Sequence, residues 1–459
     1  MNSASRLVVV SSRGPYRISK SLHSIKYERT VGGLVTSLLP MLEQLGGEWI
    51  AWGEPAGRYA LPIRKPRFDL RYLSLTPEQV RGFYHGFSNS ALWPLCHYFL
   101  GRVRYDLAEW QMYEQVNQLF AQVVLEDAGE DDIIWVHDYQ LARVPYFIRQ
   151  QRPSAQMLFF WHIPFPPADL FKTLPWRRQL LESLLACDIV GFHIPDYARN
   201  FMETVAQLLQ VPIDGDSIHF AGRRIRVLAS PIGIDYAAID HEARSRRAES
   251  RVQRLRDALG MGMLIVGVER MDYTKGIVER LRAVEYLLEH RPAWCGKFCL
   301  IQIVTPSRLD VEAYRQKKRE VDETVGRING RFSDGIWIPI RYLHRSFSPS
   351  ELIAYYRAAD IALVTPLRDG LNLVAKEYVA SRIHADGVVI LSEFAGAAYQ
   401  LPEALITNPY SPEDMATTLE QALRMPKLEQ QWRMEAMRNR LKAEDIKWWA
   451  NEFLQYLNQ

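Results

Sequence analysis

Short apolar runs recur along this chain. Most are followed by polar or glycine-containing residues and then by a stretch with helical spacing. Continuous apolar runs of this length are typical of strands buried in a parallel sheet. A first series predicts strands at Leu7–Val10, Glu48–Trp52, Ile133–Val136, Leu158–Trp161 and Ile189–Phe192. A second series predicts strands at Met263–Val268, Phe298–Val304, Asp360–Pro366 and Val388–Leu391. Strands and helices in repeated alternation predict an α/β protein with two doubly wound, Rossmann-like domains.

Helices are predicted where apolar residues return at every third or fourth position. Such stretches are 32–45, which begins with a glycine pair, 196–209, and 427–459, which forms one or two helices; the segment 237–259 is predicted to be a polar helix rich in Arg and Glu. Asp196 is expected to cap the second of them. Two further segments lack such a period: the polar segment 17–30 is predicted to be a loop, and the aromatic-rich segment 83–94 is predicted to be irregular.

Composition and length narrow the class of protein. The 459 residues suffice for two or three domains, and the run Pro231–Ile234 predicts a boundary between domains 1–232 and 233–442. A net charge of +3 is too small to indicate a nucleic-acid partner. The four cysteines lack the spacing of a metal site, so free thiols in a reducing cytoplasm are expected. The apolar runs are too short to predict a signal peptide or a membrane span.

The segment Leu367–Glu377 is a candidate ligand site. The predicted strand Asp360–Pro366 comes directly before this segment, Gly370 lies in the turn, and a predicted helix follows. The backbone N–H groups and the positive end of the helix dipole at such a turn suit a phosphate or a diphosphate. Asp369 could hold sugar hydroxyls, and Glu377 could reach a ribose. The alternative is an ordinary turn with a solvated cluster of charges.

Other predicted strands also end in residues suited to ligands. Arg13 ends the first strand, where a guanidinium could grip a phosphate or form a structural salt bridge. Gly32 and Gly33 would let a ligand approach the backbone at the start of a helix. His162 follows its strand in a proline-rich loop and is either structural or catalytic.

Arg270 and Lys275 place two cations after the first strand of the second series, where a diphosphate could sit. Ligands of open α/β sheets bind beyond the carboxyl ends of the strands. A cleft between two such domains is the default ligand site. Together these features favour phosphorylated, sugar-like ligands.

Ordered motifs over nearly the whole chain resemble a known family. They read SSRGP, VGGLV, FYHGFSNSALWP, WVHDY, FFWHIPFPP, LPWR, CDIVGFH, VERMDYTKG, PSRLDVEAY, VGRINGRF, TPLRDGLNLVAKEYV and LSEFAGAA. This set is similar to the trehalose-6-phosphate synthases, the retaining glycosyltransferases of family 20. The resemblance implies the glycosyltransferase B architecture, in which two Rossmann-like domains face each other across a cleft. It also implies that the C-terminal helix 443–459 packs back on the N-terminal domain.

The resemblance implies that glucose passes from a nucleoside-diphosphate glucose, with UDP-glucose expected, to glucose 6-phosphate. The products would be α,α-trehalose 6-phosphate and the nucleoside diphosphate, with retention at the anomeric carbon. No cofactor, no metal and no covalent intermediate is implied. The identity of the donor base, the presence of a homo-oligomer and any allosteric control are left open.

By the same resemblance the C-terminal domain would hold the donor. Arg270 and Lys275 would stabilise the leaving diphosphate, and Asp369 and His162 would hold the transferred glucose; these four would be the catalytic residues. The remaining donor contacts would be Gly32 and Gly33 closing over the donor, Phe347 beside the base, the backbone at Leu373, Val374, Ala375 and Lys376 on the phosphates, and Glu377 on the ribose.

The acceptor would lie on the N-terminal domain. Its phosphate would be gripped by Arg13, Tyr84 and Arg308. The acceptor sugar would be surrounded by Trp52, Trp93 and Asp138.

Two departures from the family pattern adjoin the acceptor side. Gln140 stands where the family commonly has histidine, and Ser12 stands where it commonly has asparagine. The related glucosylglycerol-phosphate synthases, which use glycerol 3-phosphate, are therefore an alternative, although Gly32, Gly33 and Arg308 agree with the trehalose branch. An alternative of another class is a non-catalytic relative that binds sugar phosphates and has a regulatory role.

Overall fold

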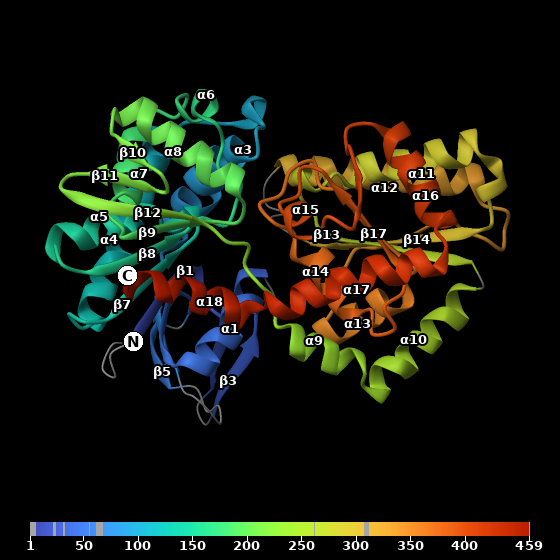
Figure 1. The fold of residues 1–459 in the computed structure, drawn as a ribbon, viewed down its shortest axis with the longest axis horizontal. Coiled ribbons are helices and arrows are strands. Elements are labelled where there is room, and N and C mark those ends of the chain that lie inside the picture. The colour runs from blue at the N-terminus through green and yellow to red at the C-terminus, as the bar shows by residue number, and fades with distance from the viewer. Residues whose placement is uncertain are drawn as a thin grey trace. The chain divides into compact units, whose positions relative to one another are not determined.

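The computed structural model describes residues 6–21, 24–30, 33–54, 56–60, 68–260, 262–306 and 312–458. The chain divides into two compact units (Figure 1). The first comprises Met1–Ile232 together with Ile446–Gln459, and the second comprises Gly233–Asp445. The chain therefore leaves the first unit once and returns to it through its last helix. No helix among the described residues is long and apolar enough to span a membrane.

A mixed sheet forms the centre of the first unit. Within the described residues its strand order is β10-β11-β12-β9-β8-β7-β1-β4-β6-β5. The strands are β1 (Leu7–Arg13), β4 (Gly47–Trp52), β5 (Gly57–Ala60), β6 (Phe68–Leu73), β7 (Ile133–His137), β8 (Gln156–Phe160), β9 (Ile189–Phe192), β10 (Ile213–Asp214), β11 (Ser217–Phe220) and β12 (Arg223–Ala229). The strands from β12 to β6 run parallel, and the outer pairs are antiparallel. The carboxyl ends of β1, β7 and β8 therefore lie at the same edge of the sheet.

Helices connect these strands. They are α1 (Gly33–Leu45), α2 (Pro77–Gln79), η1 (Val80–Leu92), α3 (Trp93–Cys96), η2 (Leu100–Arg102), α4 (Leu107–Asp127), η3 (Tyr139–Leu141), α5 (Val144–Gln151), α6 (Ala168–Phe171), α7 (Arg177–Leu184), α8 (Pro195–Leu209), α18 (Ile446–Gln455) and η6 (Tyr456–Asn458). The last helix, α18, docks through aromatic side chains: the ring centroid of Trp449 lies 4.9 Å from that of Trp135, and that of Phe453 lies 5.3 Å from that of Phe160. All four rings are fully buried, so α18 forms part of the core of the first unit.

The second unit contains a parallel sheet with the order β15-β14-β13-β16-β17-β18 within the described residues. Its strands are β13 (Met263–Arg270), β14 (Phe298–Thr305), β15 (Ile340–Leu343), β16 (Ile361–Val364), β17 (Val388–Ser392) and β18 (Leu405–Thr407). Its helices are α9 (Tyr236–Ala243), α10 (Arg246–Leu259), η4 (Tyr273–Lys275), α11 (Ile277–His290), η5 (Pro292–Trp294), α12 (Glu312–Phe332), α13 (Pro349–Ala358), α14 (Leu373–Ser381), α15 (Ala397–Gln400), α16 (Pro412–Arg424) and α17 (Lys427–Ala443).

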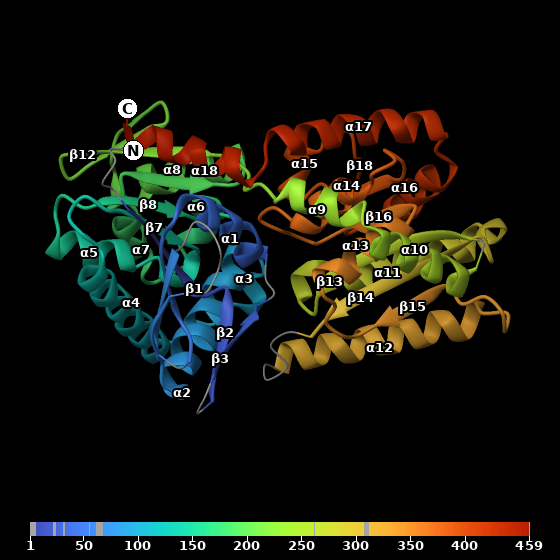
Figure 2. The ribbon, with the colours of Figure 1, turned by 90° about the horizontal axis from the view of Figure 1, so that it is seen from below.

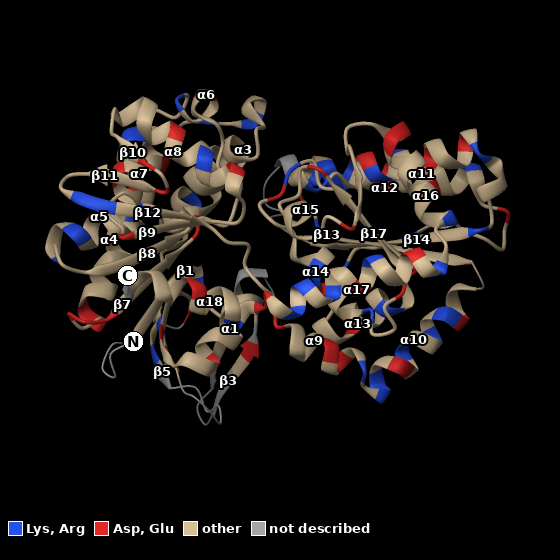
Figure 3. Cartoon of the chain, in the orientation of Figure 1, with Lys and Arg blue, Asp and Glu red and all other residues tan. Residues whose placement is uncertain are grey.

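Apolar side chains of the sheet and of α11, α12 and α16 form the core of the second unit. Helix α17 crosses this unit and packs against α14 (Figure 2). Charged residues of both signs lie along α10 (Figure 3), in agreement with the polar helix expected in that part of the chain.

Two segments for which no helix or strand was predicted contain regular structure. The loop predicted for 17–30 is wrong, because β2 (Tyr16–Ser21) and β3 (Ser24–Arg29) form an antiparallel hairpin. Backbone hydrogen bonds pair the two strands whatever their side chains are, so a polar ribbon carries no apolar signal. The irregular segment predicted for 83–94 is confirmed only in part: it lies in the π-helix η1 and the helix α3, but a kink with non-helical backbone at Gly86 (φ −74°, ψ −111°) interrupts η1. The i→i+5 hydrogen bonds of η1 give a period other than 3.6, which hides the helix in the sequence.

Two helix details also differ from the prediction. Asp196 does not cap α8, which begins at Pro195 after Ile194; Asp196 lies in the first turn and forms an ion pair with Arg199. The single helix predicted for 237–259 is two helices, because Ser245 caps a new one by accepting a hydrogen bond from the Ala248 N–H at 3.1 Å. A serine of this kind offers the backbone an alternative to continuing the helix.

Candidate active site

Three residues predicted for the acceptor side come together at the end of β1. The guanidinium carbon of Arg13 lies 4.9 Å from the ring centroid of Tyr84 and 5.6 Å from that of Trp52. These are cation–π distances, so the two rings hold an exposed cation in place. The indole Nε1 of Trp52 is buried and has no hydrogen-bond partner among the described residues. The cluster therefore offers a fixed, exposed guanidinium to an anionic ligand.

Asp138 and His162 meet at the ends of β7 and β8. Asp138 has a positive φ of 76°, which is uncommon for a residue other than glycine. Its Oδ1 accepts hydrogen bonds from the backbone N–H of Tyr139 at 3.0 Å and from that of His162 at 3.3 Å. Burial lowers the pKa of His162 to about 3, so the imidazole is neutral at physiological pH.

Trp93 belongs to a neighbouring aromatic group. It lies in α3 with 6% of its surface exposed, and its ring centroid is 4.0 Å from that of His97 and 5.9 Å from that of Tyr139. The Tyr139 hydroxyl donates a hydrogen bond to Asn89 Oδ1 at 3.0 Å. Trp93 therefore packs on Tyr139, the residue that follows Asp138.

In the second unit, Lys275 and Asp369 form an ion pair. Lys275 Nζ lies 2.5 Å from Asp369 Oδ2, and both side chains are largely buried, at 9% and 16% exposed. Asn372 also donates to Asp369 Oδ2 at 3.1 Å. Gly276 follows Lys275 with a φ of +63°, and a Cβ there would lie 2.3 Å from the Thr365 carbonyl oxygen. Only glycine allows the two loops to approach this closely.

A third loop fixes the backbone around Asp369. The Asp369 N–H donates to the Phe394 carbonyl at 3.1 Å, and the Gly396 N–H donates to the Asp369 carbonyl at 3.2 Å. The Ala397 N–H donates to the Leu371 carbonyl at 2.7 Å. The Asp369 carboxylate is therefore presented from a rigid turn.

Arg270 is the last residue of β13, and 44% of its side chain is exposed. Its Nη2 lies 3.9 Å from Asp272 Oδ2. Asp272 is buried, and its Oδ1 accepts a hydrogen bond from the Thr274 N–H at 3.0 Å. The loop thus anchors a carboxylate beside a guanidinium that is partly accessible at the end of β13.

Glu377 lies in α14, where the Tyr356 hydroxyl donates to its Oε2 at 3.1 Å. Burial raises the pKa of Glu377 to about 7, although this hydrogen bond opposes the rise. Phe347 is buried before α13: its ring centroid lies 5.3 Å from that of Tyr355, and the guanidinium carbon of Arg345 lies 4.5 Å from the Phe347 ring centroid.

The start of α14 separates the predicted phosphate contacts into two pairs. Leu373 and Val374 are partly exposed, whereas Ala375 and Lys376 are fully buried. The Ala375 N–H donates to the capping side chain of Asn372 at 3.3 Å. Burial lowers the pKa of Lys376 to about 7. The Lys376 side chain is therefore enclosed, and only its backbone remains as a candidate contact.

The structure leaves two predicted residues undescribed, since Gly32 and Arg308 lie outside the described residues; Gly33 is the first residue of α1. His162 belongs to the first unit, whereas Asp369 belongs to the second. No group of three histidine, cysteine or acidic residues suited to a metal occurs within the described ranges.

Three residues that support the site were not singled out from the sequence. Asn372 has a φ of 83° and caps α14, which an asparagine just before a predicted helix could have indicated. Glu269 and Arg280 form a fully buried ion pair at 3.1 Å between β13 and α11. A charge directly after the predicted strand 263–268 was the only signal for this pair.

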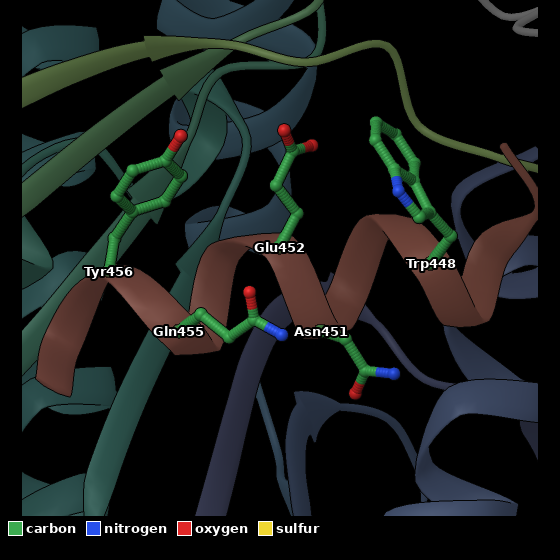
Figure 4. A pocket seen from close by; sticks show the side chains of 5 residues that line it. All are labelled: Trp448, Asn451, Glu452, Gln455 and Tyr456. Atoms are coloured by element: carbon green, nitrogen blue, oxygen red, sulfur yellow. The ribbon is translucent and has the colours of Figure 1, made fainter.

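A surface hollow of about 400 Å³ lies on the C-terminal helix α18. Its lining residues are distant in sequence from the predicted substrate contacts. Figure 4 shows Trp448 and Glu452 of α18 and Tyr456 of the adjoining η6 on the same side of the helical ribbon. Glu452 is already engaged, because its Oε2 accepts a hydrogen bond from Ser230 Oγ at 2.6 Å. None of the residues predicted to bind substrate lines this hollow.

Comparison with known proteins agrees with this organisation. A bifunctional trehalose-6-phosphate synthase/phosphatase of Thermoproteus tenax is 40% identical over 463 residues, covering 98% of this chain and 63% of that protein. A glucosylglycerol-phosphate synthase of Picosynechococcus is 39% identical over 433 residues, covering 88% of this chain and 86% of that protein. The crystal structure of a UDP-forming α,α-trehalose-phosphate synthase from Burkholderia xenovorans, in complex with glucose 6-phosphate, has a TM-score of 0.91 at 35% identity, covering 99% of this chain and 100% of that one.

The fold and the charged strand ends define a glycosyltransferase of the B type. The family model described as glycosyltransferase family 20 matches residues 5–459, and the chain belongs to this family. The predicted family and the predicted pair of Rossmann-like domains are therefore confirmed. The chain spans slightly less than two thirds of the bifunctional Thermoproteus relative.

Proposed function

We propose that the chain transfers glucose from UDP-glucose to glucose 6-phosphate with retention, releasing α,α-trehalose 6-phosphate and UDP. The observation that carries this proposal is a pair of cationic strand ends, one in each unit. Arg13, held by Trp52 and Tyr84, suits the phosphate of a sugar phosphate. Arg270 and Lys275 suit the diphosphate of a nucleotide sugar. A reaction between two phosphorylated substrates needs both.

In this proposal the first unit binds the acceptor and the second binds the donor. Arg13 and Tyr84, with Arg308, take the acceptor phosphate, while Trp52, Trp93 and Asp138 surround its sugar. The buried indole N–H of Trp52 supplies a hydrogen bond to an acceptor oxygen. This assignment keeps the acceptor sugar beside the strained turn at Asp138.

On the donor side, Arg270 and Lys275 stabilise the negative charge that develops on the leaving diphosphate, an electrostatic role. Asp369 moves from its pairing with Lys275 to accept hydrogen bonds from the glucose hydroxyls, with His162 as the second contact of that sugar. Leu373, Val374 and the backbone at Ala375 and Lys376 lie along the phosphates.

The remaining donor contacts bind the nucleoside and cover the donor. Glu377 accepts hydrogen bonds from the ribose, and Phe347 lies beside the base. Gly32 and Gly33 cover the donor. No side chain is assigned as a nucleophile.

The test is nucleoside diphosphate release from UDP-glucose with glucose 6-phosphate or glycerol 3-phosphate in parallel reactions. Release with glucose 6-phosphate alone is the expected result. Arg270→Ala should lower turnover at least about 100-fold, as removal of a charge-stabilising donor does, with an unchanged melting temperature. Arg282→Ala is the control, since this exposed arginine on α11 pairs only with Glu320 among its described partners. Near-normal turnover of Arg270→Ala would contradict its role.

The second candidate function uses glycerol 3-phosphate as the acceptor. It is favoured by Gln140 and Ser12, which depart from the family pattern beside the acceptor residues, and by the similar glucosylglycerol-phosphate synthase. Release with glycerol 3-phosphate alone would select this function. If neither acceptor causes nucleoside diphosphate release from UDP-glucose, ADP-glucose or GDP-glucose, a non-catalytic sugar-phosphate-binding role would be favoured. A cytoplasmic location stays a prediction based on four cysteines that are all free thiols.

A further inference from the structure

The predicted sugar contact His162 is hydrogen-bonded to a second histidine, His137, which is fully buried. His137 is the last residue of β7 and is fully buried, and His162 follows β8. His137 Nδ1 lies 3.0 Å from His162 Nε2, which is a hydrogen bond. The third ring of this group, His193, is engaged elsewhere, because its Nδ1 accepts from the Ile232 N–H at 3.4 Å.

Both members of the pair are neutral. Burial lowers the pKa of His137 well below its ordinary value, and a charge on His162 would lower it further. Burial likewise lowers the pKa of His162. In a hydrogen bond between two neutral imidazoles, one nitrogen carries the proton and the other accepts it. The pair therefore has two alternative arrangements, and each fixes the tautomer of both rings.

The far nitrogen of His137 distinguishes the two arrangements. His137 Nε2 is buried and has no hydrogen-bond partner among the described residues. If His162 donated, His137 would carry its proton on this nitrogen, leaving a buried N–H unpaired. The adjacent Trp135, whose ring centroid is 5.0 Å away, already has a buried Nε1–H without a partner in the described part of the chain. An orphaned N–H is rarer in proteins than an unused acceptor, and two in one layer are less favourable still.

We infer that His137 donates its Nδ1–H to His162 Nε2 and so fixes His162 in the Nδ1–H tautomer. His162 is only partly buried, and no hydrogen bond to its Nδ1 occurs within the described residues. Its accessible nitrogen is then a hydrogen-bond donor. The lone pair on Nε2 is occupied by His137, so His162 does not act as a general base.

This inference deepens the proposed function, on which its catalytic part rests. His162 would donate a hydrogen bond to a hydroxyl oxygen of the transferred sugar, and that hydroxyl would use its own proton elsewhere. His137 touches no substrate and is a positioning residue, because it acts through the ring of His162. A sugar analogue with fluorine in place of the contacted hydroxyl would lose less affinity than a deoxy analogue if the histidine is a donor.

The direct test is nitrogen NMR of the full chain labelled with ¹⁵N-histidine. The resonances of His162 are assigned by their loss in His162→Asn. The expected result is a protonated Nδ1 and an unprotonated Nε2 in His162. A proton on Nε2 of His162 would overturn the inference. This measurement needs no turnover, so it stands even if the proposed reaction proves wrong.

Two variants at His137 separate positioning from packing. His137→Asn keeps an amide donor near the position of Nδ1, whereas His137→Leu fills similar space without a donor. We expect the asparagine variant to retain the Nδ1–H tautomer and most of kcat. The leucine variant should show mixed tautomers and about tenfold lower kcat, the effect of about one neutral hydrogen bond, with the acceptor KM unchanged. Equal losses in the two variants would assign His137 a packing role only.

Discussion

Replacing Glu377 by glutamine tests whether α14 presents a desolvated carboxylate. The carboxyl has its pKa raised from 4.5 to about 7 by burial, and its Oε2 accepts the hydrogen bond from the Tyr356 hydroxyl. Glutamine has the same shape, and its carbonyl oxygen can accept that hydrogen bond. The substitution therefore removes the charge and leaves the packing nearly unchanged.

The magnitude follows from linkage between protonation and folding. Below pH 4.5 the carboxyl is protonated in both states, and stability is not affected. Between pH 4.5 and about 7 the unfolded chain has lost the proton that the folded chain still holds, so stability falls as pH rises. A rise in pKa of this size corresponds to about 3 kcal/mol of lost stability above pH 7. The glutamine variant does not pay this cost.

We therefore expect Glu377→Gln to melt at nearly the same temperature as the wild type at pH 4.5. At pH 8 its transition should be higher by roughly 6–12 °C, as expected for about 3 kcal/mol in a unit of this size. Differential scanning calorimetry across this pH range measures the difference. Glu435→Gln, at an exposed position in α17, is the control and should show no such trend. A difference that does not change with pH would refute the reasoning.

The same carboxyl should control donor binding. Ribose hydroxyls donate to a charged carboxylate, so the wild-type affinity for UDP-glucose should fall as pH decreases below about 7. Glu377→Gln should bind UDP-glucose about tenfold more weakly at pH 8 and lose the pH dependence. Isothermal titration calorimetry at several pH values checks this. If the variant binds UDP-glucose with unchanged affinity, Glu377 does not contact the ribose.

Three further substitutions test packing, burial and the acceptor cluster. Gly191→Ala should destabilise the first unit by about 1–3 kcal/mol, because a Cβ there would lie 2.6 Å from ring atoms of two phenylalanines. Calorimetry measures this loss of stability, and Gly101→Ala is the control, because a Cβ at Gly101 would meet no other atom within 4 Å. Lys376→Met should raise the melting temperature most at pH 7 and below, because burial lowers the pKa of the lysine from 10.5 to about 7 and the wild type therefore loses stability as pH falls from 10.5 to about 7. It should leave the donor KM unchanged, and a large rise in that KM would show that the side chain contacts the donor. Arg13→Lys should raise the KM for the acceptor about tenfold without changing the donor KM, since a lysine lacks the planar guanidinium that stacks on the aromatic rings. The same acceptor KM in the variant and the wild type would contradict the role of the cluster.

The central strands of the sheets in both units were predictable from the sequence because they are buried on both faces. The apolar runs at β1, β7, β9, β13 and β17 all correspond to strands whose residues are largely or wholly buried. Burial on both faces requires continuous apolar residues, which is a strong signal. The hairpin β2–β3 and the π-helix η1 gave no comparable signal, since neither combines an apolar face with a standard period.

The candidate site was predictable only in part. Arg13, Trp52 and Tyr84 come from three separate segments, and no spacing in the chain indicates that the two rings enclose the guanidinium. The pairing of Lys275 with Asp369 joins positions 94 residues apart. Sequence indicated that each charge lies at a strand end, whereas the partners of these charges depend on how the loops meet.

The sequence by itself determined the alternation of strand and helix, the positions of the strand ends and the family, because each follows from local patterns of residues. Tertiary structure decided which charges are neutralised, which are exposed and which protons are held. Burial lowers the pKa values of His137 and His162 and raises that of Glu377, and each shift depends on groups brought together from different elements. Desolvation is a property of the packed interior, so no local pattern of residues could have shown it.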